Sequence, residues 1–264
     1  MFHNILDRIL ETKKEELANF QMPERQEKQK RLSLREALVH PHHKLGLIAE
    51  VKQASPSKGL MCETMDPREV AKSYERAGAD AVSVLTDRTY FRGSMENLIK
   101  VKKTVHLPVL RKDFIIDERQ VEEADRIGAD AILLIAAALE PMQLHELYLS
   151  AREKGLESLV EVHRKEEAEA VLNVFTPEIM GVNNRNLKTF ETNLEVTARL
   201  ADVIPEGVVF VSESGVSAPK DVFYLKHRGA DAALVGEALI RSGSTEKKVA
   251  ELFGAEVKRH APLT

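Results

Sequence analysis

Short apolar segments rich in β-branched residues recur along this chain, and stretches with helical spacing separate them. Between the segments, apolar residues return every three or four positions, as at Val70, Tyr74 and Ala77, which is typical of amphipathic helices. Strands that alternate with helices form parallel sheets with crossover connections, and eight of them close a (β/α)8 barrel, the TIM barrel. The eight predicted strands are Leu47–Val51, Ala81–Leu85, Leu107–Leu110, Ala131–Ile135, Ser158–Val162, Ile179–Val182, Val208–Val211 and Ala232–Val235.

A short internal repeat supports the same architecture. The sequence Gly-Ala-Asp-Ala occurs at Gly78–Ala81, Gly128–Ala131 and Gly229–Ala232, at intervals of 50 and 101 residues. Each copy precedes or begins a predicted strand, so we interpret it as a helix end that turns into a strand. Glycine there takes the left-handed conformation that ends many helices. The repeat therefore predicts structural joints between equivalent βα units, not catalytic groups.

The first 45 residues differ from the rest. They contain no strand pattern, whereas Ile5, Ile9 and Leu17 have helical spacing, and a segment of this size buries too little surface to be stable alone. The 264 residues suit one barrel, which takes about 250. We therefore expect an N-terminal helical extension, residues 1–45, that packs across one end of the barrel, and a (β/α)8 catalytic domain, residues 46–264.

Charge and composition narrow the classes of partner. A formal net charge of −4 and a pI near 6.2 leave no basic excess for a nucleic-acid backbone or an anionic membrane surface. The apolar runs are shorter than the roughly 20 residues of a membrane-spanning helix, and the N-terminus lacks a secretory signal pattern. A single cysteine, Cys62, excludes an intrachain disulfide and a Cys-rich zinc site. We expect a small-molecule ligand, a cytoplasmic location, and no nucleic-acid or membrane partner.

Polar residues end several of the predicted strands. Catalytic groups of (β/α)8 barrels project from the carboxyl ends of the strands, so residues at these ends should converge on one cavity. Alternate side chains of a strand share a face, which places Glu50 and Lys52 together at the barrel mouth. The strand-end residues are Glu50, Lys52, Lys112, Glu161, Asn183, Arg185 and Glu213.

A second group of residues is suited to binding phosphate. The loops after the seventh and eighth strands of such barrels commonly hold this anion with backbone N–H groups. Here these loops contain Ser214, Gly215 and Gly236, and glycine lets the backbone approach an anion closely. Ser55, in the turn after the first strand, offers a further hydroxyl donor, although a polar turn explains it equally well.

Several of these segments resemble the motifs of one enzyme family, the indole-3-glycerol-phosphate synthases. The resemblance extends over the whole predicted barrel, with the motifs in the family's order. It implies that the chain converts 1-(2-carboxyphenylamino)-1-deoxyribulose 5-phosphate to indole-3-glycerol phosphate, carbon dioxide and water, in tryptophan biosynthesis. The matching segments are Ile48–Lys52 with Ala54–Gly59, Val109–Ile115, Leu159–His163, Gly181–Leu187 and Ser212–Gly215.

The resemblance also implies roles for the site residues. Lys112 matches the general acid of ring closure, Glu161 an acid/base group, and Lys52 a lysine that contacts the substrate carboxylate and assists dehydration, while Glu50 holds the lysines in place. The division of proton transfers among Lys52, Lys112 and Glu161 is not fixed by the sequence. Other residues match groups that bind the substrate (Asn183, Arg185, Glu213) or its phosphate (Ser55, Ser214, Gly215, Gly236). Phe91 and Phe114 follow the second and third strands, where apolar rings can flank the aromatic part of the substrate; the alternative is that they only pack against neighbouring side chains.

Two other functions compete with this one. A phosphate-binding barrel can use Lys52 or Lys112 as a Schiff-base nucleophile, as aldolase-like barrels do. The second alternative is a phosphate-ligand binding barrel without activity. Protons and fixed charges suffice for the implied reaction, so we expect neither a metal nor a cofactor. The sequence leaves open the oligomeric state and any association with other enzymes of tryptophan synthesis.

Overall fold

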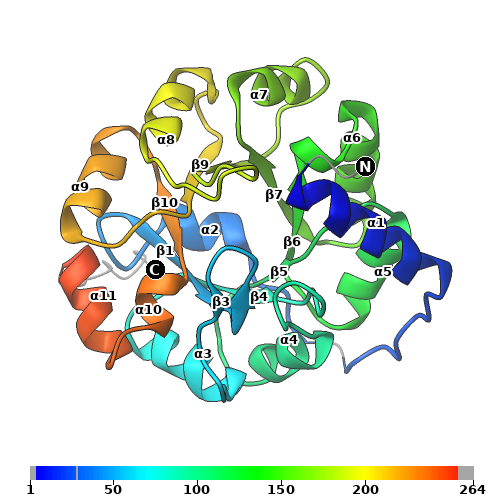
Figure 1. Ribbon diagram of the computed structural model, residues 1–264, viewed down its shortest axis with the longest axis horizontal. Coiled ribbons are helices and arrows are strands. Elements are labelled where there is room, and N and C mark those ends of the chain that lie inside the picture. Colours follow the sequence, from blue (N-terminus) through cyan, green and yellow to red (C-terminus); the bar gives the residue numbers. More distant parts are fainter. Residues whose placement is uncertain (1–3, 28, 255–264) are drawn as a thin grey trace, which may run out of the picture.

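The computed structural model describes residues 4–27 and 29–254, and its centre is a closed barrel of eight parallel strands (Figure 1). The strands follow one another around the barrel in chain order, and β1 closes the ring by pairing with both β4 and β10. The predicted (β/α)8 fold is therefore confirmed. The barrel strands are β1 (Gly46–Val51), β4 (Ala81–Leu85), β5 (Val109–Lys112), β6 (Ala131–Ile135), β7 (Glu157–Val162), β8 (Ile179–Asn183), β9 (Val209–Glu213) and β10 (Ala232–Val235).

Helices surround the barrel. The sequence dictates their starts locally: in the first of them, Asp66 accepts a hydrogen bond from the Arg68 N–H, and Pro67 occupies the first turn, where no N–H is needed. The surrounding helices are α3 (Pro67–Arg76), α4 (Met95–Lys102), α5 (Glu118–Arg126), α6 (Pro141–Glu153), α7 (Lys165–Leu172), α8 (Glu195–Leu200), α9 (Pro219–His227), α10 (Glu237–Ile240) and α11 (Thr245–Phe253). Shorter elements are β2 (Ala54–Ser55), β3 (Gly59–Leu60), η1 (Ala136–Ala138) and η2 (Ala201–Val203).

Five predicted strands differ from the structure: three by a single residue at one end, and two, the third and the seventh, by up to two residues. The third barrel strand spans Val109–Lys112 instead of Leu107–Leu110, and the seventh spans Val209–Glu213 instead of Val208–Val211. In the third strand, Pro108 has no N–H to donate to a ladder, whereas the Lys112 carbonyl still accepts a hydrogen bond from Thr86 N at 3.1 Å. Both strands therefore extend further toward the carboxyl end. As a result, Lys112 and Glu213 are fixed within strands and do not lie on loops.

The Gly-Ala-Asp joints have the predicted conformation. Their glycines have φ of 81°, 86° and 87°, in the left-handed region that ends the preceding helix. Each following aspartate accepts a backbone N–H from the adjacent strand, which fixes where that strand begins. These hydrogen bonds are Asp80 Oδ2 to Leu47 N (2.8 Å), Asp130 Oδ2 to Val109 N (2.8 Å) and Asp231 Oδ2 to Phe210 N (2.9 Å).

The N-terminal helices cover both ends of the barrel. Leu34 and Leu38 of α2 (Leu34–Val39) pack into the cluster of apolar side chains that fills the barrel interior. Ile5, Leu6 and Ile9 of α1 (Ile5–Ala18) line a cavity at the carboxyl ends of the strands. The expectation that this segment covers a single end was therefore wrong. Figure 1 looks along the barrel, with α2 across its centre and α1 over the side of α5 and α6.

The helical segment stays close to the barrel throughout its described length, and β1 begins at Gly46. We still propose residues 1–45 as the extension and residues 46–264 as the catalytic domain, the last ten of which lie outside the described residues. Among the described residues, no helix is both long and apolar enough to cross a membrane.

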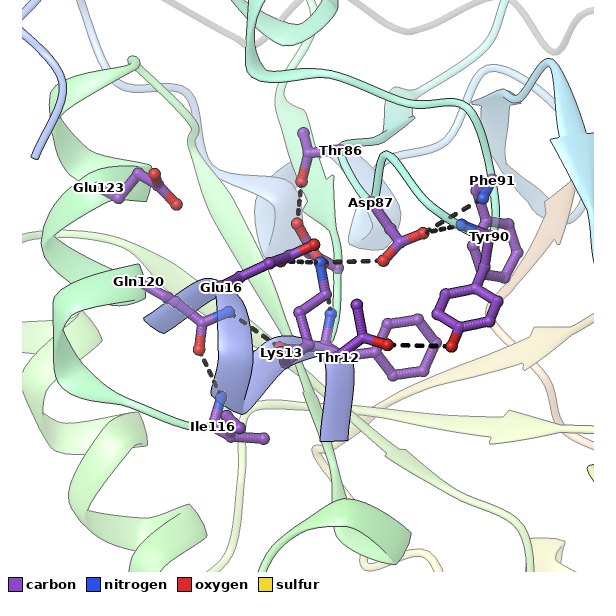
Figure 2. A network of polar contacts seen from close by, with 12 residues as sticks. Thr12, Lys13, Glu16, Thr86, Asp87, Tyr90, Phe91, Ile116, Gln120 and Glu123 are labelled. Carbon is purple, nitrogen blue, oxygen red and sulfur yellow. Dashed lines mark hydrogen bonds and ion pairs between the residues drawn. The ribbon is translucent and has the colours of Figure 1, made fainter. Parts of the chain in front are cut away.

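A buried lysine ties α1 to the barrel. Lys13 Nζ lies 2.9 Å from Asp87 Oδ2 and 3.0 Å from Asp113 Oδ1, and the three side chains are at most 4% exposed. Figure 2 shows Lys13 pointing from α1 toward Asp87, which also accepts the N–H groups of Tyr90 and Phe91. Burial lowers the pKa of Lys13, but the two aspartates outweigh it and raise the pKa above its usual value. The ammonium therefore stays charged inside the protein.

We expect Lys13→Met to reduce the free energy of unfolding by about 3–5 kcal/mol, because removing one partner of a buried ion pair leaves the other charges uncompensated. Urea unfolding followed by circular dichroism measures the change. The matched control is Lys14→Met, because the Lys14 side chain is 66% exposed, and surface substitutions usually change stability by no more than about 0.5 kcal/mol. Equal stability of the two variants would show that the buried pairs contribute nothing to docking α1.

Candidate active site

The predicted site residues come together in one cavity. It has a volume of about 820 Å³ and lies at the carboxyl ends of the barrel strands, a size that suits a small organic ligand. The rule that strand ends converge therefore located the cavity correctly. Every residue that the sequence placed in the site lines this cavity: Glu50, Lys52, Ser55, Phe91, Lys112, Phe114, Glu161, Asn183, Arg185, Glu213, Ser214, Gly215 and Gly236.

Charged side chains form the deepest part of the cavity wall. Glu50, Lys112, Glu161 and Glu213 belong to β1, β5, β7 and β9, which alternate around the barrel with β10, β8, β6 and β4. Side chains from alternate strands form one layer inside a (β/α)8 barrel, normally an apolar one. Here the layer holds carboxylates and an ammonium, and its three glutamates are at most 4% exposed. Their charges therefore interact strongly, with little screening by water.

Glycines on the intervening strands make room for this layer. A Cβ atom on Gly181, in β8, would come closer than 3.0 Å to Glu213 Oε1, and one on Gly236, just after β10, would come equally close to Glu50 Oε2. Such separations do not occur in real structures, so any side chain at either position would displace a carboxylate. Gly236, which the sequence assigns to phosphate binding, is therefore also needed as glycine to leave space for Glu50.

Lys112 lies between two of the carboxylates. Its Nζ atom is 3.2 Å from Glu161 Oε2 and 3.4 Å from Glu213 Oε2. Burial lowers the pKa of Lys112, but the charges of Glu161, Glu213 and Glu50 outweigh this effect and raise the pKa above its usual value. The resting side chain is therefore an ammonium.

The pKa values of the two carboxylates next to Lys112 are shifted in opposite directions. Burial raises the pKa of both. For Glu161, the Lys112 ammonium and the His163 imidazole outweigh burial and lower the pKa below its usual value. For Glu213, the negative charge of Glu161 adds to burial and keeps the pKa well above its usual value. Like charges this close cannot both ionise freely, so Glu213 holds a proton more tightly than Glu161 does.

The second lysine of the cavity has its own carboxylate. Lys52 Nζ forms an ion pair with Glu50 Oε2, as expected for residues on one face of β1. The backbone carbonyl of Glu50 accepts a hydrogen bond of 3.0 Å from the Tyr74 hydroxyl, which fixes the end of the strand. Glu50 also contributes to the field at Lys112, so this carboxylate acts on both lysines.

At the predicted phosphate end, the chain after β9 makes an unusual turn. Ser214 has φ of 67° and Gly215 has φ of 96°, so a non-glycine residue occupies the left-handed region at a cost of order 1 kcal/mol. Ser55 and Gly236 also line the cavity. They follow β1 and β10, and β10 lies between β1 and β9 in the barrel. Glycine at position 215 lets the backbone approach a ligand closely, and backbone N–H groups in turns can form concavities that bind anions.

We expect Gly236→Ala to lower both kcat and the affinity for phosphorylated ligands, because its side chain would displace Glu50 and crowd the anion. The matched variant is Gly181→Ala, which displaces Glu213 from the other side of the layer and should lower kcat alone. Steady-state kinetics and calorimetric titration with glycerol phosphate measure the two effects. Unchanged affinity in folded Gly236→Ala would place the phosphate elsewhere in the cavity.

Two aromatic rings face each other across another part of the cavity wall. The ring centroids of Phe91 and Phe114 lie 6.1 Å apart at a tilt of 36°. Asp87 accepts the Phe91 N–H at 3.2 Å, and Asp113 accepts the Phe114 N–H at 2.8 Å. The aspartates held by Lys13 therefore also fix the backbone of both rings, which links the docking of α1 to the shape of the site.

Asn183 and Arg185 occupy the end of β8 and the loop that follows it. Asn183 Oδ1 accepts the Arg185 N–H at 3.0 Å, and the Arg185 guanidinium donates to the Phe190 carbonyl at 3.0 Å. An isolated bridge between Arg185 and Thr192 closes the loop. The loop is thus held by its own hydrogen bonds, with both polar side chains at the cavity wall.

Some cavity residues were missed by the sequence interpretation. Ile5, Leu6 and Ile9 of α1 form part of the wall, and so do Leu187 and Phe190 of the loop after β8. The apolar spacing of α1 predicted that it packs on the barrel, but spacing does not say at which end. Nothing in the strand-end rule points to residues that lie before the first strand or several positions after the sixth.

The fold and the cavity together define the class of protein: a (β/α)8-barrel enzyme with a buried lysine–glutamate site at the carboxyl ends of its strands. A sequence model of the family "Indole-3-glycerol phosphate synthase" matches residues 6–252. The chain therefore belongs to the indole-3-glycerol phosphate synthase family. As a member, it is an enzyme of tryptophan biosynthesis, a carboxy-lyase that closes a ring.

Similar curated proteins agree with this assignment. An indole-3-glycerol phosphate synthase from Shouchella clausii is 54% identical over 249 residues, which cover 94% of this chain and 97% of the relative. One from Priestia megaterium is 55% identical over 256 residues, which cover 97% of this chain and all of the relative (100%). The two matches extend over nearly the full length of both proteins.

Solved structures support the fold. A 3-hexulose-6-phosphate synthase from Salmonella typhimurium superimposes with a TM-score of 0.64 at 12% identity, covering 79% of this chain and 96% of that one. A chain of a tryptophan synthase complex from Pyrococcus furiosus gives 0.59 at 16% identity, covering 81% of this chain and 99% of that one. At such low identity these likenesses concern the barrel alone.

Proposed function

We propose that this chain forms indole-3-glycerol phosphate from 1-(2-carboxyphenylamino)-1-deoxyribulose 5-phosphate by acid–base catalysis with Lys112 and Glu161. The observation that carries the proposal is the Lys112 ammonium held between Glu161 and Glu213, at 3.2 Å and 3.4 Å, in a cavity that also has an aromatic pair and a candidate phosphate turn. The membership of the family supplies the reaction, and the cavity supplies groups for each part of it.

Lys112 acts first, as the general acid. Ring closure joins the aromatic carbon that bears the carboxylate to the ketone carbon of the sugar, and negative charge develops on the ketone oxygen. A fixed ammonium in a buried site stabilises that charge and delivers a proton to it. Loss of carbon dioxide then leaves its electron pair in the ring and restores aromaticity.

Glu161 acts in the dehydration that follows. The new hydroxyl leaves as water after receiving a proton, and a base removes a proton from the neighbouring carbon to complete the indole double bond. Glu161 is the ionised carboxylate of the site and suits the base. Glu213, whose pKa is raised, lies 3.4 Å from Lys112 Nζ and keeps this side chain in place. Lys52, held by Glu50, contacts the substrate carboxylate and assists the departure of the hydroxyl.

The remaining cavity residues bind the two ends of the substrate. Ser55, Ser214, Gly215 and Gly236 hold the phosphate, with support from the left-handed turn at residues 214–215. Phe91 and Phe114 flank the aromatic ring, since their tilted, offset arrangement suits edge and face contacts with a third ring. The polar side chains of Asn183 and Arg185 contact the sugar part and the carboxylate between these ends.

A Schiff-base mechanism fits the site poorly. A lysine attacks a carbonyl as the neutral amine, so nucleophilic lysines have a lowered pKa. The carboxylates around Lys112 raise its pKa, and Lys52 has an ion pair of its own. Borohydride added during turnover should therefore trap no adduct on either lysine by mass spectrometry.

The direct test of the proposed function follows the fluorescence of the indole product when purified protein meets the carboxyphenylamino-deoxyribulose phosphate. We expect turnover without added metal ions and without cofactor, and formation of one carbon dioxide per indole. A protein that binds the substrate in calorimetry but forms no indole would be a binding barrel and would contradict the proposal.

A further inference from the structure

The two oxygens of the Glu161 carboxylate face different partners. Oε2 lies 3.2 Å from Lys112 Nζ, inside the cavity. Oε1 lies 3.4 Å from Nε2 of His163, the second residue along the chain. His163 is absent from the cavity wall, although its side chain is largely buried, at 10% exposed. The imidazole therefore reaches the catalytic carboxylate from the side opposite the substrate.

Beyond His163, charged groups of alternating sign lead to the surface. His163 Nδ1 lies 3.6 Å from Glu167 Oε2 in α7, and that oxygen also accepts the His163 backbone N–H at 2.7 Å. Glu167 Oε1 pairs with the Arg164 guanidinium at 2.8 Å, and the Arg164 side chain is 70% exposed. The row Lys112, Glu161, His163, Glu167 and Arg164 thus connects the cavity with the surface of the protein.

The His163 ring is poised between its two carboxylates. Among the described residues, neither ring nitrogen has a hydrogen-bond partner with good geometry, so a small tilt of the ring can strengthen either contact. Burial and the Lys112 charge lower the pKa of His163, but Glu167 and Glu161 outweigh them and raise it above its usual value. The imidazole therefore holds its second proton more tightly than a free histidine does.

The proposed reaction requires a proton supply. Lys112 gives one proton to the ketone oxygen and, after it is reprotonated, a second to the departing hydroxyl, while the proton that Glu161 removes from carbon returns to Lys112. The substrate carboxylate leaves as neutral carbon dioxide, so each turnover consumes one proton from solvent. A substrate that fills the cavity blocks the access of solvent to Lys112 and Glu161 through the cavity. The proton must therefore reach them through the surrounding protein.

We propose that His163, acting through Glu161, is the relay that returns this proton to the catalytic lysine from the surface behind the barrel. The inference rests on the proposed function above and assigns His163 as a positioning and relay residue, since it does not touch the substrate.

The step balances as a chain of proton transfers. The Nε2–H of His163 passes to Glu161 Oε1, while Nδ1 takes a proton from a solvent acid that enters beside Glu167. Rotation of the Glu161 carboxyl group brings the proton to the side of Lys112, whose neutral amine accepts it and becomes an ammonium again. No other bond forms or breaks, and a tautomer change of the ring prepares the next cycle.

The test uses the variant His163→Gln, which preserves polarity but does not titrate in the neutral range. We expect kcat to fall by roughly 10²-fold, the lower end of the usual range for acid–base groups, with KM unchanged. Rapid mixing should show a burst of about one indole per active site before the slow phase, because the first turnover uses protons already present. Added imidazole should accelerate the slow phase in proportion to its concentration.

Three comparisons make the test decisive. His106→Gln changes a histidine whose side chain is 97% exposed, and it should leave kcat and the imidazole response as in the parent protein. Glu167→Gln removes the outer carboxylate and should slow turnover less, with partial rescue by imidazole. Glu161→Gln should be slow and insensitive to imidazole, because the residue through which His163 acts is gone.

Other outcomes overturn the relay. Turnover of His163→Gln within about twofold of the parent would show that the proton takes another route. A slow variant without a burst, or one that imidazole and other small acids fail to accelerate, would make His163 a purely structural support of Glu161. Should His163→Gln fail to fold by circular dichroism, His163→Asn takes its place. Inactivity of the parent protein itself would instead contradict the proposed function.

Discussion

Lys112→Ala should reduce indole formation by roughly 10³-fold or more, the combined effect of losing a general acid and a buried positive charge. The substitution removes the only ammonium within ion-pair distance of both Glu161 and Glu213 among the described residues. Without it, the pKa of Glu161 rises, because the largest charge that opposes burial is gone, and the base of the dehydration is weakened as well. The phosphate turn at residues 214–215 is untouched, and phosphorylated analogues should still bind.

Fluorescence kinetics and calorimetric titration separate these effects. Lys112→Arg is the matched control: it retains the positive charge between the carboxylates, but a guanidinium does not release its proton readily. We expect Lys112→Arg to fold with normal stability and to remain nearly inactive. Near-normal turnover of either variant would remove Lys112 from the role of acid, and restored activity in the arginine variant would reduce the role of Lys112 to electrostatic support.

Much of the cavity could be predicted from the sequence because barrel geometry is strongly periodic. Side chains alternate between faces along a strand, so Glu50 and Lys52 had to share a face, and they do form an ion pair. The rule that functional groups lie at the carboxyl ends of strands then gathered residues from β1, β5, β7 and β9 without any knowledge of their contacts.

The sequence could not predict which side chains of the charged layer pair with each other. Lys112 could have paired with any carboxylate at the barrel mouth, and the choice of Glu161 and Glu213 depends on the stagger of strands around the closed ring. The opposite pKa shifts of these two carboxylates follow from distances and burial, and a sequence motif gives neither. The same holds for Gly181, whose missing side chain leaves the space that Glu213 occupies.

The N-terminal segment shows a different limit. Helical spacing of apolar residues predicts an amphipathic helix, but both ends of a barrel offer apolar surface. The contacts that fix the position of α1 involve Lys13, although lysine side chains are usually exposed to solvent. Its partners Asp87 and Asp113 follow β4 and β5, and a buried ion pair between segments so distant in the chain has no local signal.

Glu161→Gln should slow turnover by roughly 10²–10⁴-fold, the usual loss when an acid–base group is removed, with little change in the affinity for substrate analogues. Glutamine has nearly the size of glutamate and still accepts a hydrogen bond from Lys112, but it cannot take a proton from carbon. Kinetics under saturating substrate and calorimetry with a non-reactive analogue measure the two quantities.

The rest of the site should adjust in a defined way. The negative charge of Glu161 helps to keep the pKa of Glu213 high, so in the variant that pKa falls and Glu213 becomes the ionised partner of Lys112. The ammonium is thereby retained, and the first step should survive. Glu161→Asp is the matched control: it keeps the charge but draws the carboxylate back, and it should retain more activity than the glutamine variant.

Rapid quenching of a single turnover then shows which step Glu161 serves. Since Lys112 can still close the ring, we expect Glu161→Gln to accumulate a decarboxylated compound that keeps its hydroxyl, with carbon dioxide released faster than indole appears. Accumulation of unreacted substrate instead would place Glu161 in ring closure, together with Lys112. Parental turnover across the pH range would leave Glu161 as a structural partner of the lysine and would move the base of the dehydration to Glu213 or Glu50, the other carboxylates of the buried layer.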